Sequence, residues 1–290
     1  FVFTGSGNVT TAVGDAVTLT GTVQEYFPGG AATGNLSTTQ IGAVTDLSID
    51  SRGNALPEAA VIGDGGRVPP TEVIDDDGLA VFDPGNDGID FYESLEGMRV
   101  TVKDAVAASA TNRFGEIFVL ADEGEGATGR NDRGGITLAP DDANPERIQI
   151  QFDDDVLRNF DQTVDVGARL GDVTGVVDYN FGNFEVKVTQ AFPILAPSAL
   201  ERETTALTPT ENVLTIATYN VLNLSPQDTA QLAALGAQIA TNLGGPDIIG
   251  LQEIQDASGE VDDGTVSGAA TLQALADAIA AAGGPAYAFA

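Results

Sequence analysis

Hydrophobic and polar residues alternate along most of the first two thirds of the chain. In residues 16–23, AVTLTGTV, the side chains of Val17, Leu19 and Val23 fall on one face of an extended strand. Similar runs between Gly, Asn and Asp residues predict strands at 98–106, 116–120, 147–152, 170–179 and 184–189. The residues predicted to form the core are Val17, Leu19, Val100, Val102, Val119, Leu120, Val173 and Val177. We therefore expect an all-β region without a long helix.

The pattern changes after residue 212. Residues 213–219 are typical of a buried strand, and Ser225 and Pro226 predict the N-cap and first residue of a helix. Apolar residues at helical spacing follow until a Gly-Gly-Pro stop at 244–246.

A second strand and a second helix are predicted after this stop, at 247–252 and about 269–282, and a further strand begins at Tyr287. The succession of strand, helix and strand predicts a parallel β-α-β unit with a right-handed crossover.

A weak internal repeat divides the β-rich region. A Val-Gly turn followed by a strand with an internal Gly occurs at 13–23 and again at 166–177, and such a Gly permits the coiling that closes small barrels. This predicts two barrel-like modules, over 1–75 and 76–192, with chance similarity as the alternative. The second module carries an acidic insert near its start, residues 193–212 form a Pro-punctuated linker, and 213–290 form the last region.

Composition excludes several kinds of chemistry. The 290 residues include no Cys, His or Trp. The chain therefore has no disulfide, no thiolate nucleophile, no His-dependent catalytic triad and no Cys-ligated or His-ligated zinc. An enzyme made of these residues must rely on carboxylates, amides, hydroxyls, Lys, Arg or a hard metal ion.

The charge is strongly acidic, with 43 Asp and Glu against 12 Lys and Arg and a formal net charge of −31. Such a surface is typical of proteins that work in salty media, and an anionic substrate must be met by locally gathered cations. No stretch is long and apolar enough for a membrane span, and no signal peptide is present in this sequence.

Two polar residues close the predicted parallel strands, Asn220 after 213–219 and Glu253 after 247–252. Ligand sites of open α/β sheets lie beyond the carboxyl ends of strands, so these side chains are expected to converge. An amide oxygen and a carboxylate suit Mg²⁺ or Mn²⁺, with Ca²⁺ as a further possibility. The alternative is an ordinary Asn turn and a strand cap without function.

The same two segments resemble a known superfamily. Residues 214–221 (LTIATYNV) and 246–253 (PDIIGLQE) resemble the first two motifs of the endonuclease/exonuclease/phosphatase superfamily, the deoxyribonuclease-I-like phosphodiesterases. Other segments resemble more narrowly the secreted nucleases of the ExeM and NucH type: 91–98 (FYESLEGM), 112–116 (NRFGE), 129–133 (GRNDR) and 178–183 (DYNFGN). The resemblance implies an all-β OB-like barrel region, with the modules 1–75 and 76–192, followed by the N-terminal part of an α/β sandwich.

The resemblance also implies roles and an activity. Asn220 matches the Asn that contacts the phosphate and the metal shell, and Glu253 matches the metal-binding Glu. The family's catalytic His pair lies further along, and residues 203–290 contain no Lys, Arg or His. We therefore expect a fragment of an extracellular or cell-surface metal-dependent nuclease acting on DNA or RNA, inactive by itself and without an obligate protein partner.

Six of the twelve cations are candidates for such a gathering, and all six lie in the second module: Arg99, Lys103, Arg113, Arg130, Arg133 and Arg147. OB-type barrels bind single strands through a basic groove and stacking aromatics, so Arg113, Phe114, Arg130 and Arg133 form a candidate nucleic-acid face. The alternative to a nucleic-acid face is a structural role, in which Arg130 and Arg133 form salt bridges within a loop. The acidic composition favours this alternative.

Acidic runs at 75–78, 83–90 and 153–155 suggest Ca²⁺ sites, but the twelfth position counted from Asp83 is Ser94, which breaks the EF-hand spacing. Solvated charge is the favoured interpretation of these runs. Two rivals to the nuclease remain open: a phosphodiesterase of lipid or sugar substrates, and a non-catalytic nucleic-acid-binding or surface protein with a degenerate α/β part.

Overall fold

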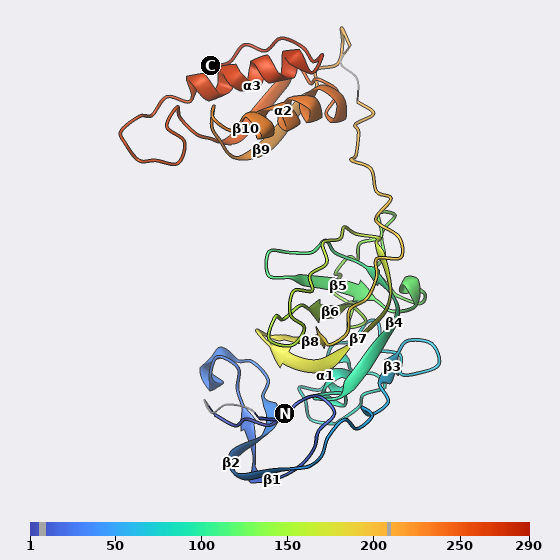
Figure 1. Cartoon of the computed structure of the whole chain (residues 1–290). Coiled ribbons are helices and arrows are strands. Elements are labelled where there is room, and N and C mark those ends of the chain that lie inside the picture. The colour runs from blue at the N-terminus through green and yellow to red at the C-terminus, as the bar shows by residue number, and fades with distance from the viewer. Residues whose placement is uncertain (6–9, 208–209) are drawn as a thin grey trace. The chain divides into compact units, whose positions relative to one another are not determined.

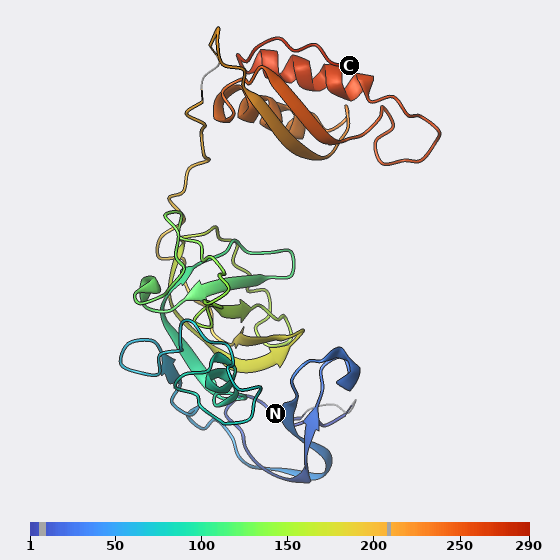
Figure 2. The ribbon, with the colours of Figure 1, turned by 180° about the vertical axis from the view of Figure 1, so that it is seen from behind.

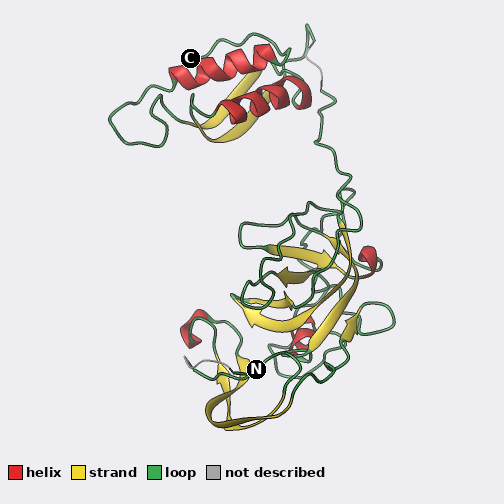
Figure 3. Ribbon diagram, in the orientation of Figure 1, coloured by secondary structure: helices red, strands yellow, loops and turns green. Residues whose placement is uncertain are grey.

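The computed structural model describes residues 1–5, 10–207 and 210–290. The chain divides into two units, Phe1–Leu200 and Glu201–Ala290, which are described separately (Figure 1). The regular elements of the first unit are mostly strands, and the second unit combines strands and helices (Figure 3). Residues 6–9 of the expected first module and 208–209 of the expected linker lie outside the described residues.

A closed barrel of five strands forms the centre of the first unit. Its strands are β4 (Arg99–Ala107), β5 (Glu116–Leu120), β6 (Ile148–Gln151), β7 (Arg169–Asn180) and β8 (Asn183–Val188). They pair in the order β4-β5-β6-β8-β7, and β7 pairs back onto β4 to close the barrel. All pairings are antiparallel except β6 with β8. The predicted β barrel is confirmed, and its architecture is compatible with an OB-like fold.

The apolar faces of the barrel strands are buried. Six of the predicted core residues are at most 1% exposed: Val100, Val102, Val119, Leu120, Val173 and Val177. Burying each such side chain contributes about 1.5–3 kcal/mol relative to leaving it in water. The alternating pattern therefore identified the interior of the barrel correctly.

A short helix lies within this core. Helix α1 (Gly88–Glu93) carries Phe91 and Tyr92 into the barrel cluster, and Leu95 follows directly after it. The helix begins at the end of the acidic insert, residues 73–90. Strand β3 (Ala60–Ile62) runs parallel to β4 and extends the sheet, and the short helical turn η2 (Asp122–Gly124) follows β5.

The first two strands form a separate sheet. Strands β1 (Ala16–Tyr26) and β2 (Thr38–Ser51) make an antiparallel pair, joined through the short turn η1 (Ala31–Thr33). Val17 is 40% exposed and Leu19 is only partly buried, so their assignment to the core is wrong. A two-stranded sheet without a second layer has little apolar surface to bury.

The second unit contains the predicted β-α-β pattern. Strands β9 (Ile216–Leu224) and β10 (Ile248–Ile254) pair in parallel, and α2 (Thr229–Ala237) with the π-helical turn η3 (Gln238–Asn242) connects them. Helix α3 (Ala269–Ala281) follows, and both helices cover the same face of the strands (Figures 1 and 2).

The core of this unit lies between the helices and that covered face. It consists of Val221, Leu224, Leu232, Leu235, Ile239, Leu275 and Ile279. On the opposite face, Ile216 and Ile248 are exposed. Parallel sheets are usually covered on both faces, so the open face is unusual for such a pair of strands.

Two expectations about boundaries in this unit are wrong. Helix α2 begins at Thr229, not Pro226, because the Asp228 carboxylate accepts hydrogen bonds from the Ser225 amide at 2.9 Å and hydroxyl at 2.6 Å and holds a turn there. No strand begins at Tyr287 in the described structure; its hydroxyl donates to the Pro246 carbonyl at 2.5 Å.

The close crossing of β7 and β8 gives a first prediction. A Cβ added to Gly175 would lie 2.3 Å from the Lys187 carbonyl oxygen. We expect Gly175→Ala to lower the free energy of unfolding of the first unit by about 2 kcal/mol, since backbone must move. Urea unfolding followed by near-ultraviolet circular dichroism of the tyrosines measures this. Gly85→Ala is the control, because its added Cβ meets only Asp83 Oδ1 at 3.6 Å. Equal losses in both variants would contradict the crowding argument.

Candidate functional site

Asn220 and Glu253 are in direct contact at the carboxyl ends of β9 and β10. Asn220 Nδ2 donates a hydrogen bond of 2.6 Å to Glu253 Oε1, and Asn220 Oδ1 accepts one of 2.9 Å from the Leu222 amide. Both side chains belong to exposed residues. The structure thus brings together the two residues that strand position alone led us to pair.

An irregular backbone holds this contact. Gln252 pairs with Asn220 and Ile254 with Leu224, so three residues of β9 lie opposite Glu253 alone. The φ angles of Leu222, Asn223 and Glu253 are 51°, 51° and 61°. Left-handed backbone at a residue other than glycine costs on the order of 1–3 kcal/mol and is concentrated at binding and catalytic sites. The strained bulge therefore supports a functional role for this end of the strands.

A second polar pair extends the bulge and was missed from the sequence. Asn223 Nδ2 donates to Glu260 Oε1 at 2.6 Å, and Gln255 Nε2 donates to Asn223 Oδ1 at 2.8 Å. Asn223 follows Asn220 by three residues, a spacing that places the two side chains on opposite faces of a regular strand, so the sequence did not group them. Glu260 lies in the loop after β10, where no periodicity reveals which residue returns to the site.

The geometry gives different roles to Asn220 and Glu253, the two predicted metal ligands. The amide oxygen of Asn220 already accepts a hydrogen bond, and its amide nitrogen faces Glu253. Glu253 Oε2 has no hydrogen bond to any residue that the structure describes. Glu253 therefore fits a hard cation such as Mg²⁺, which takes one or two carboxylates and keeps other positions for water or phosphate oxygens. Asn220 would hold the carboxylate in place.

The predicted nucleic-acid residues lie in two places. The Arg113 guanidinium lies over the Phe114 ring, 4.7 Å from its centroid, and both residues are exposed in the turn before β5. Arg130 instead donates to the carbonyls of Glu123 and Gly124, beyond the other end of β5. Arg133 is exposed in the adjoining turn. Strand β5, which is about 15 Å long, separates Arg113 and Phe114 from the segment that Arg130 contacts. The four predicted residues therefore do not form one face.

Phe114 borders an acidic cavity of about 570 Å³ on the barrel. The charged residues that line this cavity are Glu116, Asp153, Glu185 and Lys187. The exposed ring of Phe181 also lines it. Glu185 is 4% exposed, and burial raises its pKa to about 7, with Lys187 opposing the shift. Negative charge prevails around this cavity, which disfavours a phosphate there.

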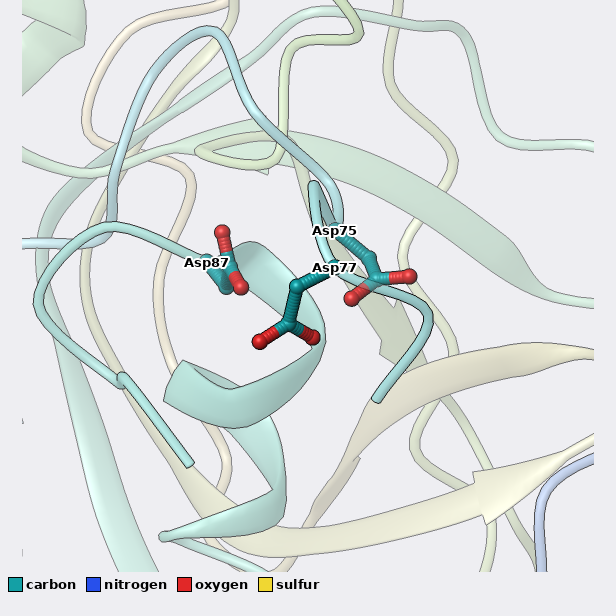
Figure 4. Close-up of side chains that lie close together, drawn as sticks. All are labelled: Asp75, Asp77 and Asp87. Carbon is teal, nitrogen blue, oxygen red and sulfur yellow. The ribbon is translucent and has the colours of Figure 1, made fainter. Parts of the chain in front are cut away.

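Three carboxylates meet beside the start of α1. Oxygens of Asp75, Asp77 and Asp87 lie within 4.8 Å of one another (Figure 4). Asp87 is 3% exposed, and its burial, together with the charges of Asp76, Asp75, Asp90 and Asp77, raises its pKa. Solvated charge is therefore the wrong description of Asp87, because the fold withdraws it from water.

Comparison with known proteins covers only the first unit. Residues 61–198 match the model of a family described as a domain of unknown function (DUF8508). The match runs from β3 through β8 and ends before β9. No curated protein matches the chain. Among the described residues, no helix has the length and apolar character that crossing a membrane requires.

The buried Glu185 predicts a pH effect. Its pKa of about 7 in the folded state exceeds the ordinary value of 4.5, so the folded protein keeps a proton that the unfolded chain releases. The stability of the first unit should therefore fall as the pH rises between these values. Glu185→Gln removes this titration. The free energy of unfolding of the variant minus that of the wild type should therefore be about 1–2 kcal/mol larger at pH ~8 than at pH ~5.

Urea unfolding at both pH values tests this effect. Glu58→Gln, at an exposed position, controls for the simple loss of one negative charge. A constant difference between Glu185→Gln and wild type at the two pH values would show that Glu185 does not titrate in this range.

Proposed function

We propose that the chain is part of an extracellular metal-dependent phosphodiesterase that hydrolyses DNA or RNA, and that its second unit is the N-terminal part of a deoxyribonuclease-I-like catalytic domain. The observation that carries this proposal is the contact between Asn220 and Glu253 on a strained bulge at the carboxyl ends of two parallel strands. The motif resemblance at 214–221 and 246–253 supports it independently of the geometry.

Asn220, Leu222 and Glu253 each have a defined role in this proposal. The Leu222 amide fixes the Asn220 side chain, and Asn220 Nδ2 fixes one oxygen of Glu253. The other oxygen of Glu253 would hold the cation, Mg²⁺ or Mn²⁺, and the bound cation would supply positive charge for the scissile phosphate. The exposure of both side chains favours a polymeric substrate over a lipid or sugar phosphodiester enclosed in a pocket.

The remaining groups that this reaction needs have other sources. Residues 203–290 contain no Lys, Arg or His, so the base that activates water would come from elsewhere in the intact protein. In the barrel, Arg113 and Phe114 are exposed and stacked on each other, so they are the predicted pair best able to contact a base. The carboxylates of the neighbouring cavity oppose a phosphate on the side of Phe114.

A second candidate function rests on the acidic cavity of the barrel. Its lining combines the exposed rings of Phe114 and Phe181 with amide side chains such as Asn112 and Gln151. This combination suits a neutral ligand with hydroxyl groups better than a phosphate. A non-catalytic binding protein is therefore the alternative if hydrolysis does not depend on Glu253.

The catalytic proposal is tested in the intact protein that contains this chain. Glu253→Gln should lower kcat for Mg²⁺-dependent DNA or RNA hydrolysis by at least about 100-fold, because the amide cannot replace the charge that holds the cation. Asn220→Ala should lower kcat by about 10- to 100-fold through loss of positioning. Asp277→Asn on the exposed side of α3 should leave kcat unchanged. Wild-type rates for Glu253→Gln would favour the binding protein.

The net charge predicts an unusual salt dependence. At about 10 mM salt the Debye length is about 30 Å, and a chain of −31 repels a polyanion over that distance. The hydrolysis rate of the intact protein should therefore rise as NaCl is added before it falls. Basic nucleic-acid-binding proteins show the opposite trend, because salt weakens their binding throughout. A rate that only declines from the lowest NaCl concentration would disprove the repulsion argument.

A further inference from the structure

We propose that Asp75, Asp77 and Asp87 bind one Ca²⁺ ion, which fastens the acidic segment 73–90 to the barrel. This site lies in the first unit, and it is independent of Glu253 and of the proposed hydrolysis.

The three carboxylates are gathered from two segments of the chain. Asp75 and Asp77 lie in one loop, with Asp76 between them, and Asp87 directly precedes α1 (Figure 4). Oxygens of all three lie within 4.8 Å of one another. An ion with bonds of about 2.4 Å to oxygen can bridge any two oxygens that lie within about 4.8 Å of each other, so the spacing of each pair is compatible with a shared Ca²⁺ ion.

Asp87 provides independent evidence that this cluster binds a cation. Its residue is only 3% exposed, and the buried Oδ1 atom has no hydrogen-bond partner among the described residues. A buried carboxylate oxygen without a donor is costly, because it has lost water and gained nothing. No Lys or Arg of the described structure forms an ion pair with the cluster. A cation would satisfy both needs.

The other two carboxylates are already held in place. Asp75 accepts hydrogen bonds of 3.1 Å from the amides of Gly78 and Leu79. Asp77 accepts bonds of 2.8 and 2.9 Å from the amides of Ala80 and Val81. A carboxylate has about four lone-pair positions, so each group can still bind an ion. Binding therefore requires little ordering of these side chains.

Ca²⁺ suits this arrangement better than Mg²⁺. Ca²⁺ accepts six to eight oxygens in irregular geometry, and acidic loops with backbone and water ligands provide such sites. Mg²⁺ requires a near-ideal octahedron at about 2.1 Å and gives up its water reluctantly. Three carboxylates from two separate segments match the irregular oxygen coordination of Ca²⁺.

An ion here would stabilise the barrel core. The amides of Gly88 and Ile89 donate to the carbonyls of Val73 and Ile74, at 3.0 Å each, so the two halves of the acidic segment already meet beside α1. Helix α1 in turn places Phe91 in the core. Relieving the repulsion among the carboxylates holds this junction closed, and the effect extends to the packing of α1.

The test uses the whole 290-residue chain after EDTA treatment, titrated calorimetrically with CaCl₂. We expect a Kd of about 10⁻⁵–10⁻³ M, and a rise in the Tm of the first unit by about 5 °C at millimolar Ca²⁺. MgCl₂ at the same ionic strength should raise the Tm by less than half as much. Asp87→Asn and Asp75→Asn should each weaken Ca²⁺ binding at least tenfold.

Two controls separate the site from general screening of an acidic protein. Asp76→Asn removes a charge from the same turn without removing one of the three ligands, and Asp141→Asn removes an exposed charge outside it. Both should keep Ca²⁺ affinity within about threefold of wild type. The site is disproved if all variants respond equally, if Mg²⁺ equals Ca²⁺, or if no heat of binding is found. If Asp87 is simply protonated, Asp87→Asn will match wild type in Tm with and without Ca²⁺, which also overturns the proposal.

Discussion

The pairing of β7 with β4 is the constraint on which the first unit depends. Strand β4 bonds to β7 over most of its length and to β5 at its end, which a flat strand could not do. The register of β4 shifts between Val102 and Ala105, and Asp104 has a φ of 43°. The Asp104 amide donates to the Asp172 carboxylate of β7 at 3.0 Å. This bulge coils β4 enough to close the barrel, and closure creates the interior into which α1 packs.

The second unit depends on a different irregularity. Its two strands pair in regular register up to Asn220 and become distorted beyond it, where Leu222 and Asn223 adopt left-handed backbone. Helices on one face stabilise the pair, since the cluster around Leu224 and Ile239 is fully buried there. The energy of that packing supports the strained end, which is where polar side chains converge. Packing and site are thus adjacent parts of the same two strands.

The sequence predicted local features well and long-range burial poorly. Alternation at Val100 and Val102 identified strands and their inner face, because the period of a strand is a local property. The same alternation at Val17 gave a strand that is exposed, since burial needs a second layer that alternation cannot reveal. Asn220 and Glu253 could be paired because parallel strands end at one edge of a sheet.

The burial of individual acidic side chains was also not predictable from the sequence. Asp87 belongs to a run that reads as solvated charge, and only the insertion of α1 into the barrel removes it from water. Glu185 alternates with apolar residues on β8, yet its burial depends on the neighbouring β6, where Gln149 donates to it at 3.1 Å. Such contacts arise from tertiary pairing, so no local pattern announces them.

The distribution of charge connects the two units with their proposed cations. Both lysines are committed to ion pairs with the protein's own carboxylates, Lys103 with Asp64 and Lys187 with Asp178. Arg52 and Arg169 are paired in the same way, with Asp15 and Glu123. Because only 12 Lys and Arg stand against 43 Asp and Glu, the proposed nuclease would rely on bound metal for much of the positive charge at a phosphate. At Asp87 a cation would neutralise the protein's own charge and stabilise the fold. At Glu253 it would present positive charge outward to a substrate. The two proposals thus give metal two distinct roles in this acidic protein, one internal to the fold and one directed at chemistry.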